Sequence, residues 1–231
     1  MKLLIINPNS SEKVTNNLKG ILRSPENVNL SFYTAPSNAP KEITGEKTSK
    51  ESEIIVLKDI KDKNIANDYD GFMVCCYSDH PLVRSLSELS KKPVMGIMQA
   101  TLLYTLSNPN VTRSFILTST SEWESILDKA ITNYFGYKEF PVNRFQKTIG
   151  LNINVTNLAD KEEYGKIKKK VNHILNEQYK NDHINCVLLG CAGMAGLDSK
   201  LSTDFPEIYF IDSCKIATEF LIGLVRFNKQ L

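Results

Sequence analysis

Two cysteines stand where the sequence could place a reactive sulfur. Cys76 ends the apolar run 71–76, and Cys191 ends the apolar run 186–191. A polar or glycine-containing turn and a helical pattern follow each of them. A thiol between a strand end and a helix start lies near unpaired backbone N–H groups and the positive end of the helix dipole, which both favour the thiolate. We therefore expect both thiols to ionise more readily than free cysteine, whose pKa is about 8.5.

The two cysteines also occupy matching places in a weak internal repeat. The run LIINPNSS resembles FILTSTSE, VCCYSD resembles LLGCAG, and KPVMGIMQA resembles FPEIYFIDS. Three pairs of matching residues are separated by nearly the same interval: 111 residues for Asn7 and Thr118, 115 for Cys76 and Cys191, and 113 for Pro93 and Pro206. We expect two related halves, each with a cysteine at the carboxyl end of a strand, where open α/β sheets bind ligands. The two sulfurs would then face each other across a cleft.

The other cysteines are interpreted as packing residues, since Cys75, Cys186 and Cys214 are not followed by such a turn. An odd count of five cysteines, two of them adjacent, does not favour a disulfide framework. No CxxC pair occurs and the three histidines show no ligand spacing, so no metal site is predicted. Neither a strand–GxGxxG–helix order nor a GxxxxGK[ST] motif occurs, so a nucleotide cofactor is not indicated.

The turns that follow the strands contain polar groups with two possible roles. In NPNSSEKVT, Asn9 and the neighbouring amides could hold a carbonyl or carboxylate, or Asn9 and Glu12 could form only a capping box. Thr118 and Ser119 offer the same choice between ligand contact and helix capping. In SDHP, His80 could be a general base, although a histidine beside a helix start is more often structural.

Short apolar runs alternate with helical patterns along the whole chain. This order indicates an α/β fold with mostly parallel sheets covered by helices on both faces. We expect one lobe at 1–98 plus 212–231 and a second at 99–211. The expected strands are 2–7, 28–33, 71–76, 93–98, 114–118, 151–155, 186–191 and 208–212, and clear helical patterns lie at 11–22, 81–89, 121–135 and 213–227.

Composition excludes several classes of protein. The chain has 231 residues with 28 basic and 26 acidic side chains, and this near balance argues against nucleic acid or an anionic membrane as the main partner. The lysines of 166–170 fit the solvated face of an amphipathic helix. Neither a signal peptide nor a membrane-spanning run is present, so we expect a cytoplasmic protein with reduced thiols. The polar segment 34–52 is either a lid or an exposed connector into the next helix.

Four short motifs are INPNSS after the first strand, VCCYSDHP, KPVMGI and LLGCAGM. Together they resemble the hydantoin and allantoin racemases of the aspartate/glutamate racemase superfamily. The resemblance implies two pseudo-symmetric α/β lobes with the active site between them, a small-molecule substrate, a homo-oligomer, and neither metal nor organic cofactor. It also implies that Cys76 and Cys191 act as acid and base on opposite faces of a carbon acid. The substrate-holding positions of the family fall on Pro8, Asn9, Tyr77, Ser78, Thr118, Ser119, Ala192, Gly193 and Met194.

The sequence departs from the family pattern at two places. His80 lies between Asp79 and Pro81 where bacterial members run directly from Asp to Pro-Gly, and Met98-Gln99 stand where many have an acidic residue. The hypothesis is racemisation of allantoin or a 5-substituted hydantoin. The alternatives are a cysteine-nucleophile cis–trans isomerase of the maleate isomerase type, a decarboxylase relative, which the presence of Cys76 disfavours, and a ligand-binding relative without turnover.

Overall fold

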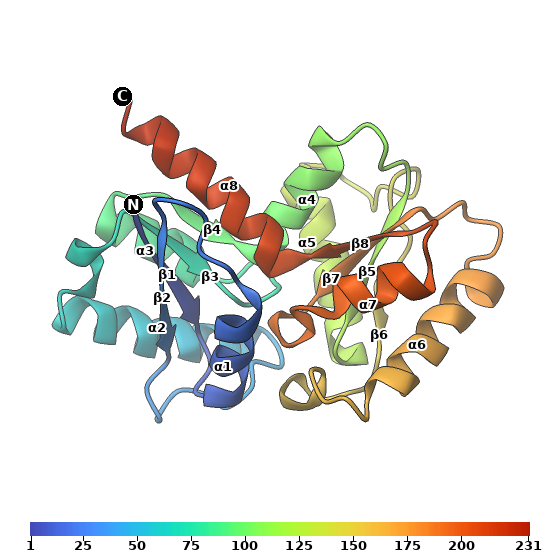
Figure 1. Cartoon of the computed structure of the whole chain (residues 1–231), viewed down its shortest axis with the longest axis horizontal. Helices are drawn as coiled ribbons and strands as arrows, with labels where there is room; N and C mark the ends of the chain where they lie inside the picture. The colour runs from blue at the N-terminus through green and yellow to red at the C-terminus, as the bar shows by residue number, and fades with distance from the viewer. The chain divides into compact units, whose positions relative to one another are not determined.

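The computed structural model describes residues 1–231 and divides into two compact units. The first unit consists of Met1–Ala100 and Cys214–Leu231, and the second of Thr101–Ser213. Each unit is built on its own sheet of four parallel strands with helices around it (Figure 1). The two units are described separately below.

The sheet of the first unit has the strand order β2-β1-β3-β4, with every neighbouring pair parallel. Parallel neighbours require crossover connections, which helices supply here. The strands are β1 (Lys2–Asn7), β2 (Asn29–Thr34), β3 (Gly71–Val74) and β4 (Val94–Gly96). The helices are α1 (Glu12–Ile21), α2 (Glu46–Asp62), α3 (Leu82–Ser90) and α8 (Ser213–Asn228), with a short 3₁₀ turn at Ile65–Asp68.

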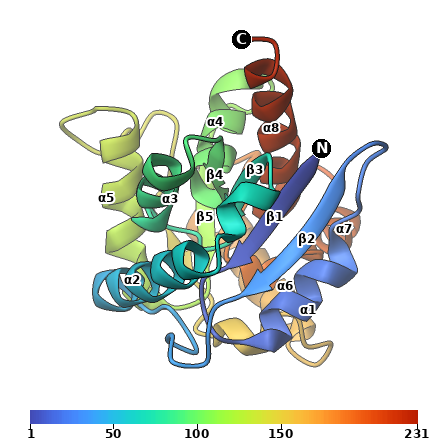
Figure 2. The same ribbon diagram turned by 90° about the vertical axis from the view of Figure 1, so that its left-hand side faces the viewer.

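Alternate side chains of β3 show which helices cover which face of this sheet. Phe72 and Val74 pack in one buried cluster with residues of α2 and α3. On the other face, a side chain at Gly71 would meet Val225 of α8, and the Thr218 hydroxyl of α8 contacts the sulfur of Met73. Figure 2 shows α2 and α3 together beside this sheet. Burial on both faces explains why the strands are continuous apolar runs.

The sheet of the second unit has the corresponding order β6-β5-β7-β8, again with all pairs parallel. Its strands are β5 (Ser114–Thr118), β6 (Ile149–Gly150), β7 (Cys186–Gly190) and β8 (Tyr209–Asp212). Its helices are α5 (Glu124–Tyr134), α6 (Tyr164–His173), α7 (Leu197–Asp204) and the part of α4 (Ile97–Ser107) from Thr101 onward. Shorter turns lie at Ser121–Trp123, Val155–Asn157 and Ala192–Met194, and a π-helical turn at Ile174–Gln178 follows α6.

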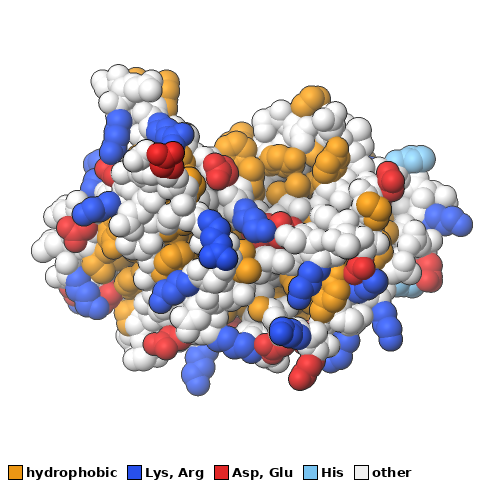
Figure 3. Space-filling model, in the orientation of Figure 1, with side chains coloured by type: hydrophobic (Ala, Val, Ile, Leu, Met, Phe, Trp, Pro, Cys, Tyr) orange, Lys and Arg blue, Asp and Glu red, His pale blue; other side chains and the backbone are white.

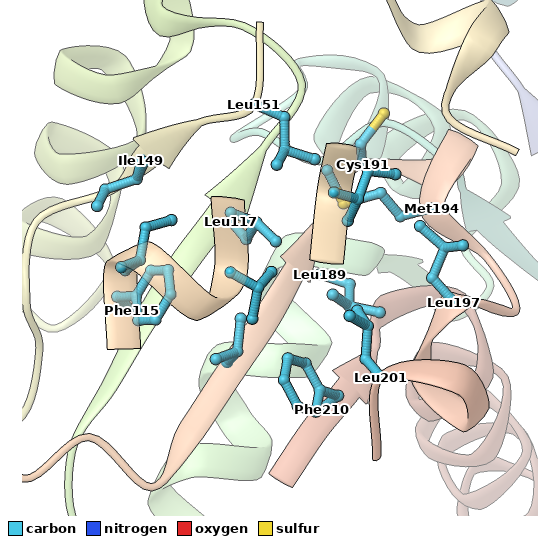
Figure 4. Packing of buried hydrophobic residues seen from close by; sticks show 14 of the residues in the cluster. Phe115, Leu117, Ile149, Leu151, Leu189, Cys191, Met194, Leu197, Leu201 and Phe210 are labelled. Carbon is cyan, nitrogen blue, oxygen red and sulfur yellow. The ribbon is translucent and has the colours of Figure 1, made fainter. Parts of the chain in front are cut away.

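A buried apolar cluster joins α6 and α7 to this second sheet (Figure 4). Phe115 and Leu117 of β5 and Leu189 of β7 face Leu201 of α7 and Ile167 of α6 within it. Helices α4 and α5 lie on the opposite side of the sheet (Figures 1 and 2). Each buried aliphatic or aromatic side chain of such a core contributes on the order of 1.5–3 kcal/mol of transfer free energy.

The predicted α/β class with parallel sheets is confirmed, but three predicted strands are wrong: the strand expected at 71–76 ends at Val74, and two others differ as follows. The strand expected at 151–155 is absent: β6 is Ile149–Gly150, just before that range, and the φ of 59° at Asn152 interrupts extended backbone after it. The strand expected at 93–98 is only Val94–Gly96, and helix α4 begins at Ile97. In both cases the apolar run continues past the point where strand pairing ends.

The polar segment 34–52 is a connector whose second part is helical. It leaves β2 at Thr34, and its residues from Glu46 onward form the first turns of α2. Between these points Ala35, Ala39 and Ile43 are buried, and the first two pack in the cluster under α2 and α3. The Ser10 N–H also donates to the Pro40 carbonyl at 2.9 Å. These contacts tie the connector to the turn after β1.

Charges are distributed as the composition indicates. In α6, Lys166, Lys168 and Lys169 are exposed while Ile167 and Val171 are fully buried, so the amphipathic helix predicted there is confirmed. On the face shown in Figure 3, basic and acidic side chains are interspersed. None of the helices combines the length and apolar character needed to traverse a lipid bilayer.

Candidate active site

Each unit places one cysteine at the carboxyl edge of its sheet. In a parallel sheet the carboxyl ends of the strands meet at one edge, where α/β proteins bind ligands. Cys76 lies two residues beyond the end of β3, and Cys191 directly follows β7. Strands β3 and β7 hold the same position in their sheets, next to β1 and β5 respectively. The two cysteines therefore occupy equivalent positions in the two strand orders.

Cys76 is half-buried, whereas the other four cysteines are buried. Its sulfur lies 3.5 Å from the Ser78 hydroxyl, and the Ser78 N–H donates to the Cys76 carbonyl at 3.0 Å. The Cys75 N–H donates to the Ile6 carbonyl of β1 at 2.8 Å, which fixes the backbone just before the turn. A serine hydroxyl so placed can donate a hydrogen bond to the sulfur.

The expected lowering of the Cys76 pKa is wrong. Desolvation by the surrounding protein raises the pKa of this thiol to about 12, and the contact with Ser78 offsets only part of that increase. The residue keeps some surface, but the atoms packed around its sulfur outweigh the backbone dipoles on which the expectation was based. Cys76 is therefore a protonated thiol at neutral pH. A proton donor is one of the two roles that an acid–base pair requires.

Cys191 begins a tight turn that holds its sulfur against a backbone amide. The Gly193 N–H donates to the Cys191 sulfur, with 3.4 Å between nitrogen and sulfur, and the Met194 N–H donates to the Cys191 carbonyl at 2.9 Å. Cys191 retains 8% of its surface. Figure 4 shows its sulfur directed away from Leu189 and Phe210, at the margin of the apolar cluster. The amide is a donor from which a negatively charged sulfur can accept.

Two glycines let this turn pack closely on its neighbours. A Cβ atom at Gly193 would lie 2.4 Å from the Val155 carbonyl oxygen, and one at Gly190 would lie 2.4 Å from the Ile116 side chain. Real Cβ contacts are essentially never shorter than 3.0 Å, so both positions need glycine for close approach. This explains the glycines in LLGCAGM without a nucleotide.

The side-chain amide of Asn9 has its oxygen bonded within the turn, while its nitrogen is available. Its Oδ1 accepts from the Ser11 N–H at 2.9 Å and from Asn7 Nδ2 at 2.9 Å. A backbone N–H can only donate, so this bond fixes which end of the Asn9 amide is oxygen. The Nδ2 group, which makes none of these bonds, is left as a donor. The structure does not contain the predicted capping box with Glu12, since Ser11 is the N-cap and makes no side-chain cap bond.

Asn7 organises this turn, although the sequence analysis named it only as a matching residue of the internal repeat and not as a site residue. It is completely buried at the end of β1, and its Nδ2 contacts Asn9 Oδ1, the Ser11 carbonyl at 3.0 Å and Thr15 Oγ1 at 3.1 Å. The Pro8 carbonyl accepts from the Ser52 hydroxyl at 2.5 Å. A polar residue at the last position of an otherwise apolar strand was the signal that could have identified Asn7.

The corresponding turn of the second unit follows β5. The Thr118 hydroxyl donates to the Gly190 carbonyl at 3.1 Å, so Thr118 links the end of β5 to the residue before Cys191. Ser119 is 2% exposed and its carbonyl accepts from the Ile153 N–H at 3.0 Å. The remaining predicted contact residues are also buried and lie beside one of the two cysteines: Tyr77, Ser78, Ala192, Gly193 and Met194.

His80 supports the start of α3. Its Nδ1 accepts from the Leu82 N–H at 3.2 Å, which requires the neutral tautomer with hydrogen on Nε2. Burial lowers the pKa of His80 to about 4, so it is uncharged at neutral pH. Its Nε2 is buried without a hydrogen-bond partner. These contacts favour the structural interpretation of this histidine over the general-base one.

The two segments in which the sequence departs from the family pattern are linked by a hydrogen bond. Gln99 Nε2 donates to Asp79 Oδ1 at 3.2 Å, which ties the start of α4 to the turn that contains Cys76. The Gln99 Oε1 atom is buried without a partner. All five cysteines are free thiols, and no group of three or more His, Cys, Asp or Glu side chains is arranged to hold a metal ion.

The family assignment follows from the comparison with protein families. The model described as Asp/Glu/hydantoin racemase matches residues 3–221, which span both units. The chain belongs to the Asp/Glu/hydantoin racemase family. Membership identifies it as an enzyme of the racemase class, acting on a small molecule.

Individual members of the family cover nearly the whole chain. An uncharacterized protein of Schizosaccharomyces pombe is 32% identical over 99% of this chain and 93% of its own length. The hydantoin racemase of Paenarthrobacter aurescens is 24% identical over 97% of this chain and 92% of its own. The allantoin racemase structure from Klebsiella pneumoniae has a TM-score of 0.80 at 22% identity, over 99% of this chain and 89% of that chain. This last likeness establishes the fold.

Proposed function

We propose that the protein racemises a cyclic ureide, either allantoin or a 5-substituted hydantoin, with two cysteines and without a cofactor. The observation that carries the proposal is the equivalent placement of Cys76 and Cys191 after the corresponding strands of two sheets with the same strand order. Inversion of a carbon acid requires proton removal on one face and proton delivery on the other, hence two groups of the same chemical kind. We also propose that the chain has two lobes, 1–98 with 212–231 and 99–211.

The proposed reaction moves one proton off the substrate and another onto it. One cysteine, as thiolate, takes the proton from the stereogenic carbon; that C–H bond breaks, an S–H bond forms, and the electron pair enters the adjacent carbonyl as an enolate. The other cysteine, as thiol, donates its proton to the opposite face of the same carbon. The enzyme ends with the protonation states of the two sulfurs exchanged. Since the pair is coupled, any measured pKa belongs to both.

We assign the resting acid role to Cys76, because burial raises the pKa of its thiol. The base role in the first turnover then goes to Cys191 as the other member of the proposed pair. The N–H of Gly193 and the Ser78 hydroxyl each contact one of the two sulfurs. The reverse direction needs the Cys76 thiolate, which forms when Cys76 gives up its proton to the substrate.

Backbone and side-chain donors near the cysteines would hold the planar intermediate. Preorganised donors of this kind are often the largest single contribution to catalysis of enolate formation. The Asn9 amide is the best-supported donor, because its oxygen is already committed to the Ser11 N–H. We propose the substrate contacts at Pro8, Asn9, Tyr77, Ser78, Thr118, Ser119, Ala192, Gly193 and Met194.

The substrate class is inferred from relatives named hydantoin racemase and allantoin racemase. Where many members have an acidic residue, Gln99 is bonded to Asp79, so this edge of the site differs from those members in charge. We also propose a cytoplasmic homo-oligomer, which sedimentation of the full-length protein would test.

The direct test is polarimetry or circular dichroism on enantiopure substrates. Purified enzyme without added metal or cofactor should abolish the optical signal of allantoin or of a 5-substituted hydantoin from either enantiomer. Cys76→Ser and Cys191→Ser should both lose inversion, whereas Cys75→Ser, which changes the neighbouring buried thiol, should retain it. Activity on free aspartate or glutamate with none on ureides would refute the proposed substrate class.

A further inference from the structure

Asp212 ties together the two ends of the turn that contains Cys191. Its backbone is the register partner of Leu189 in β7, one residue before the turn leaves the sheet at Gly190. Its side-chain Oδ2 accepts from the Gly196 N–H at 2.7 Å, where the turn ends and α7 begins. Asp212 of β8 thus contacts the chain both just before the turn that contains Cys191 and at the end of that turn.

The carboxylate of Asp212 is buried, and its burial requires compensating hydrogen bonds. Asp212 is 4% exposed, and burying a carboxylate costs free energy unless hydrogen bonds compensate. A nitrogen–oxygen distance of 2.7 Å is typical of a charge-assisted bond. The start of α7 adds the positive end of a helix dipole, which favours an acidic side chain there.

The turn that contains Cys191 ends at the residue bonded to Asp212. Gly196 has a φ of 88°, in the left-handed region, so the chain reverses sharply at the residue that Asp212 holds. Between Cys191 and Gly196 the turn is a single short 3₁₀ segment, closed by the bonds from Met194 to Cys191 and from Ala195 to Ala192. The Gly193 N–H that donates to the Cys191 sulfur lies in the middle of this segment.

We propose that Asp212 is a positioning residue for Cys191: by holding Gly196, it keeps the Gly193 N–H aimed at the sulfur and keeps the sulfur in place for proton transfer. This inference rests on the proposed function. It concerns only one of the two cysteines, because Asp212 bonds to the turn that contains Cys191. The effect of removing it must therefore be unequal for the two enantiomers of the substrate.

The test compares Asp212→Ala with Asp212→Asn. Alanine removes the acceptor, whereas asparagine keeps an oxygen that can accept from the Gly196 N–H. Asp204→Ala is the matched control. Asp204 is the last residue of α7, at the end of the helix opposite to Gly196, and it bonds to Lys168 and Tyr164. Each variant is incubated with each pure enantiomer in deuterated water, and NMR measures incorporation of deuterium at the stereogenic carbon.

Cys76→Ser identifies the enantiomer that Cys191 deprotonates, since exchange of that enantiomer persists in this variant. Asp212→Ala should slow exchange of that enantiomer by about 10- to 100-fold, the loss expected when a reacting group is displaced by about 1 Å. Exchange of the other enantiomer should be retained, and Asp212→Asn should recover most of the lost rate. Asp204→Ala should behave as wild type.

A second readout does not depend on turnover. Amide hydrogen exchange of the peptide spanning 190–197, measured by mass spectrometry, should become faster in Asp212→Ala and remain unchanged in Asp204→Ala. If wild type exchanges no ureide proton, the proposed function fails, and this peptide measurement still decides whether Asp212 orders the turn. Equal loss of exchange on both enantiomers, no recovery in Asp212→Asn, or unchanged protection of the peptide would each overturn the positioning role.

Discussion

The sulfur of Cys76 lies in surroundings that keep it protonated at neutral pH. Desolvation is the main cause, and the Ser78 hydroxyl reduces its effect without reversing it. Acid–base enzymes need groups in opposite protonation states, so a raised thiol pKa suits the cysteine that first donates a proton. At the scale of single residues, we therefore expect the Cys76 thiol to lose its proton only at high pH.

Alkylation of Cys76 should increase steadily with pH. Because its pKa is about 12, the reactive thiolate fraction should rise about tenfold per pH unit between pH 7 and pH 10. An ordinary thiol would instead level off above its pKa of about 8.5. Rates of iodoacetamide modification, resolved by mass spectrometry and compared with Cys76→Ser, would measure this. A plateau near pH 9 at Cys76 would contradict the proposed desolvation.

His80 should make the fold sensitive to acid. Burial lowers its pKa from 6.5 to about 4, so the neutral form is favoured in the folded state. The contribution to the free energy of unfolding is thus fully present above pH 6.5 and is lost as the pH falls towards 4. Between pH 7 and pH 4.5 the loss amounts to about 2 to 3 kcal/mol.

The variant His80→Asn should remove that part of the pH dependence, because asparagine can still accept from the Leu82 N–H but does not titrate. Urea unfolding at the two pH values would measure the difference. His183→Asn is the matched control, since His183 is exposed and its φ of 52° is one that asparagine tolerates. An equal pH dependence in His80→Asn and wild type would refute the assignment.

At the scale of elements, the unit that recurs is a buried strand, a polar turn and a helix. Alternation of apolar runs with helical patterns was enough to predict the strand cores, since burial on both faces requires continuous apolar residues. It could not predict where pairing stops, because Leu151 and Ile97 are as apolar as the strands they follow. The left-handed backbone at Asn152 and the helix start at Ile97 depend on contacts with the rest of the fold.

The candidate site was predictable to a similar extent and for related reasons. Cys191 and Asn9 lie at strand ends, which a sequence pattern can locate. The protonation state of Cys76 was not predictable, because desolvation depends on atoms distant in sequence that pack around the sulfur. Asp212 was missed for the same reason: its role comes from a hydrogen bond to Gly196, 16 positions earlier in the chain.

The close packing of the turn after β7 predicts that a larger side chain at Gly193 destabilises the fold. Gly193→Ala should lower the free energy of unfolding by about 1–3 kcal/mol, since the added Cβ would meet the Val155 carbonyl at 2.4 Å and backbone must move. Gly165→Ala is the control: it lies within α6 with no atom within 4 Å, and alanine there should add up to about 1 kcal/mol of helix stability. Urea denaturation of both variants would compare them. Equal stability of the two would contradict the packing argument.

At the scale of the whole molecule, two units repeat one plan. Both sheets have the same strand order, and in each a cysteine follows the corresponding strand, β3 in the first unit and β7 in the second. A racemase must treat two mirror-image substrates alike, and under the proposed function the duplicated framework would supply two similar proton-transfer groups. Under the proposed mechanism each unit acts on one enantiomer, so the contributions of the two units can be measured separately.

The most direct test is deuterium incorporation into each pure enantiomer by the single cysteine variants. A serine hydroxyl is far too weak an acid to replace a thiolate base, so Cys76→Ser should exchange the proton of one enantiomer while barely inverting it. Cys191→Ser should exchange only the opposite enantiomer, at a rate that rises with pH because little of Cys76 is thiolate at neutral pH, and the double variant should exchange neither. If both single variants lose exchange equally on both enantiomers, the two-base mechanism is contradicted, and a single cysteine nucleophile would be the better account.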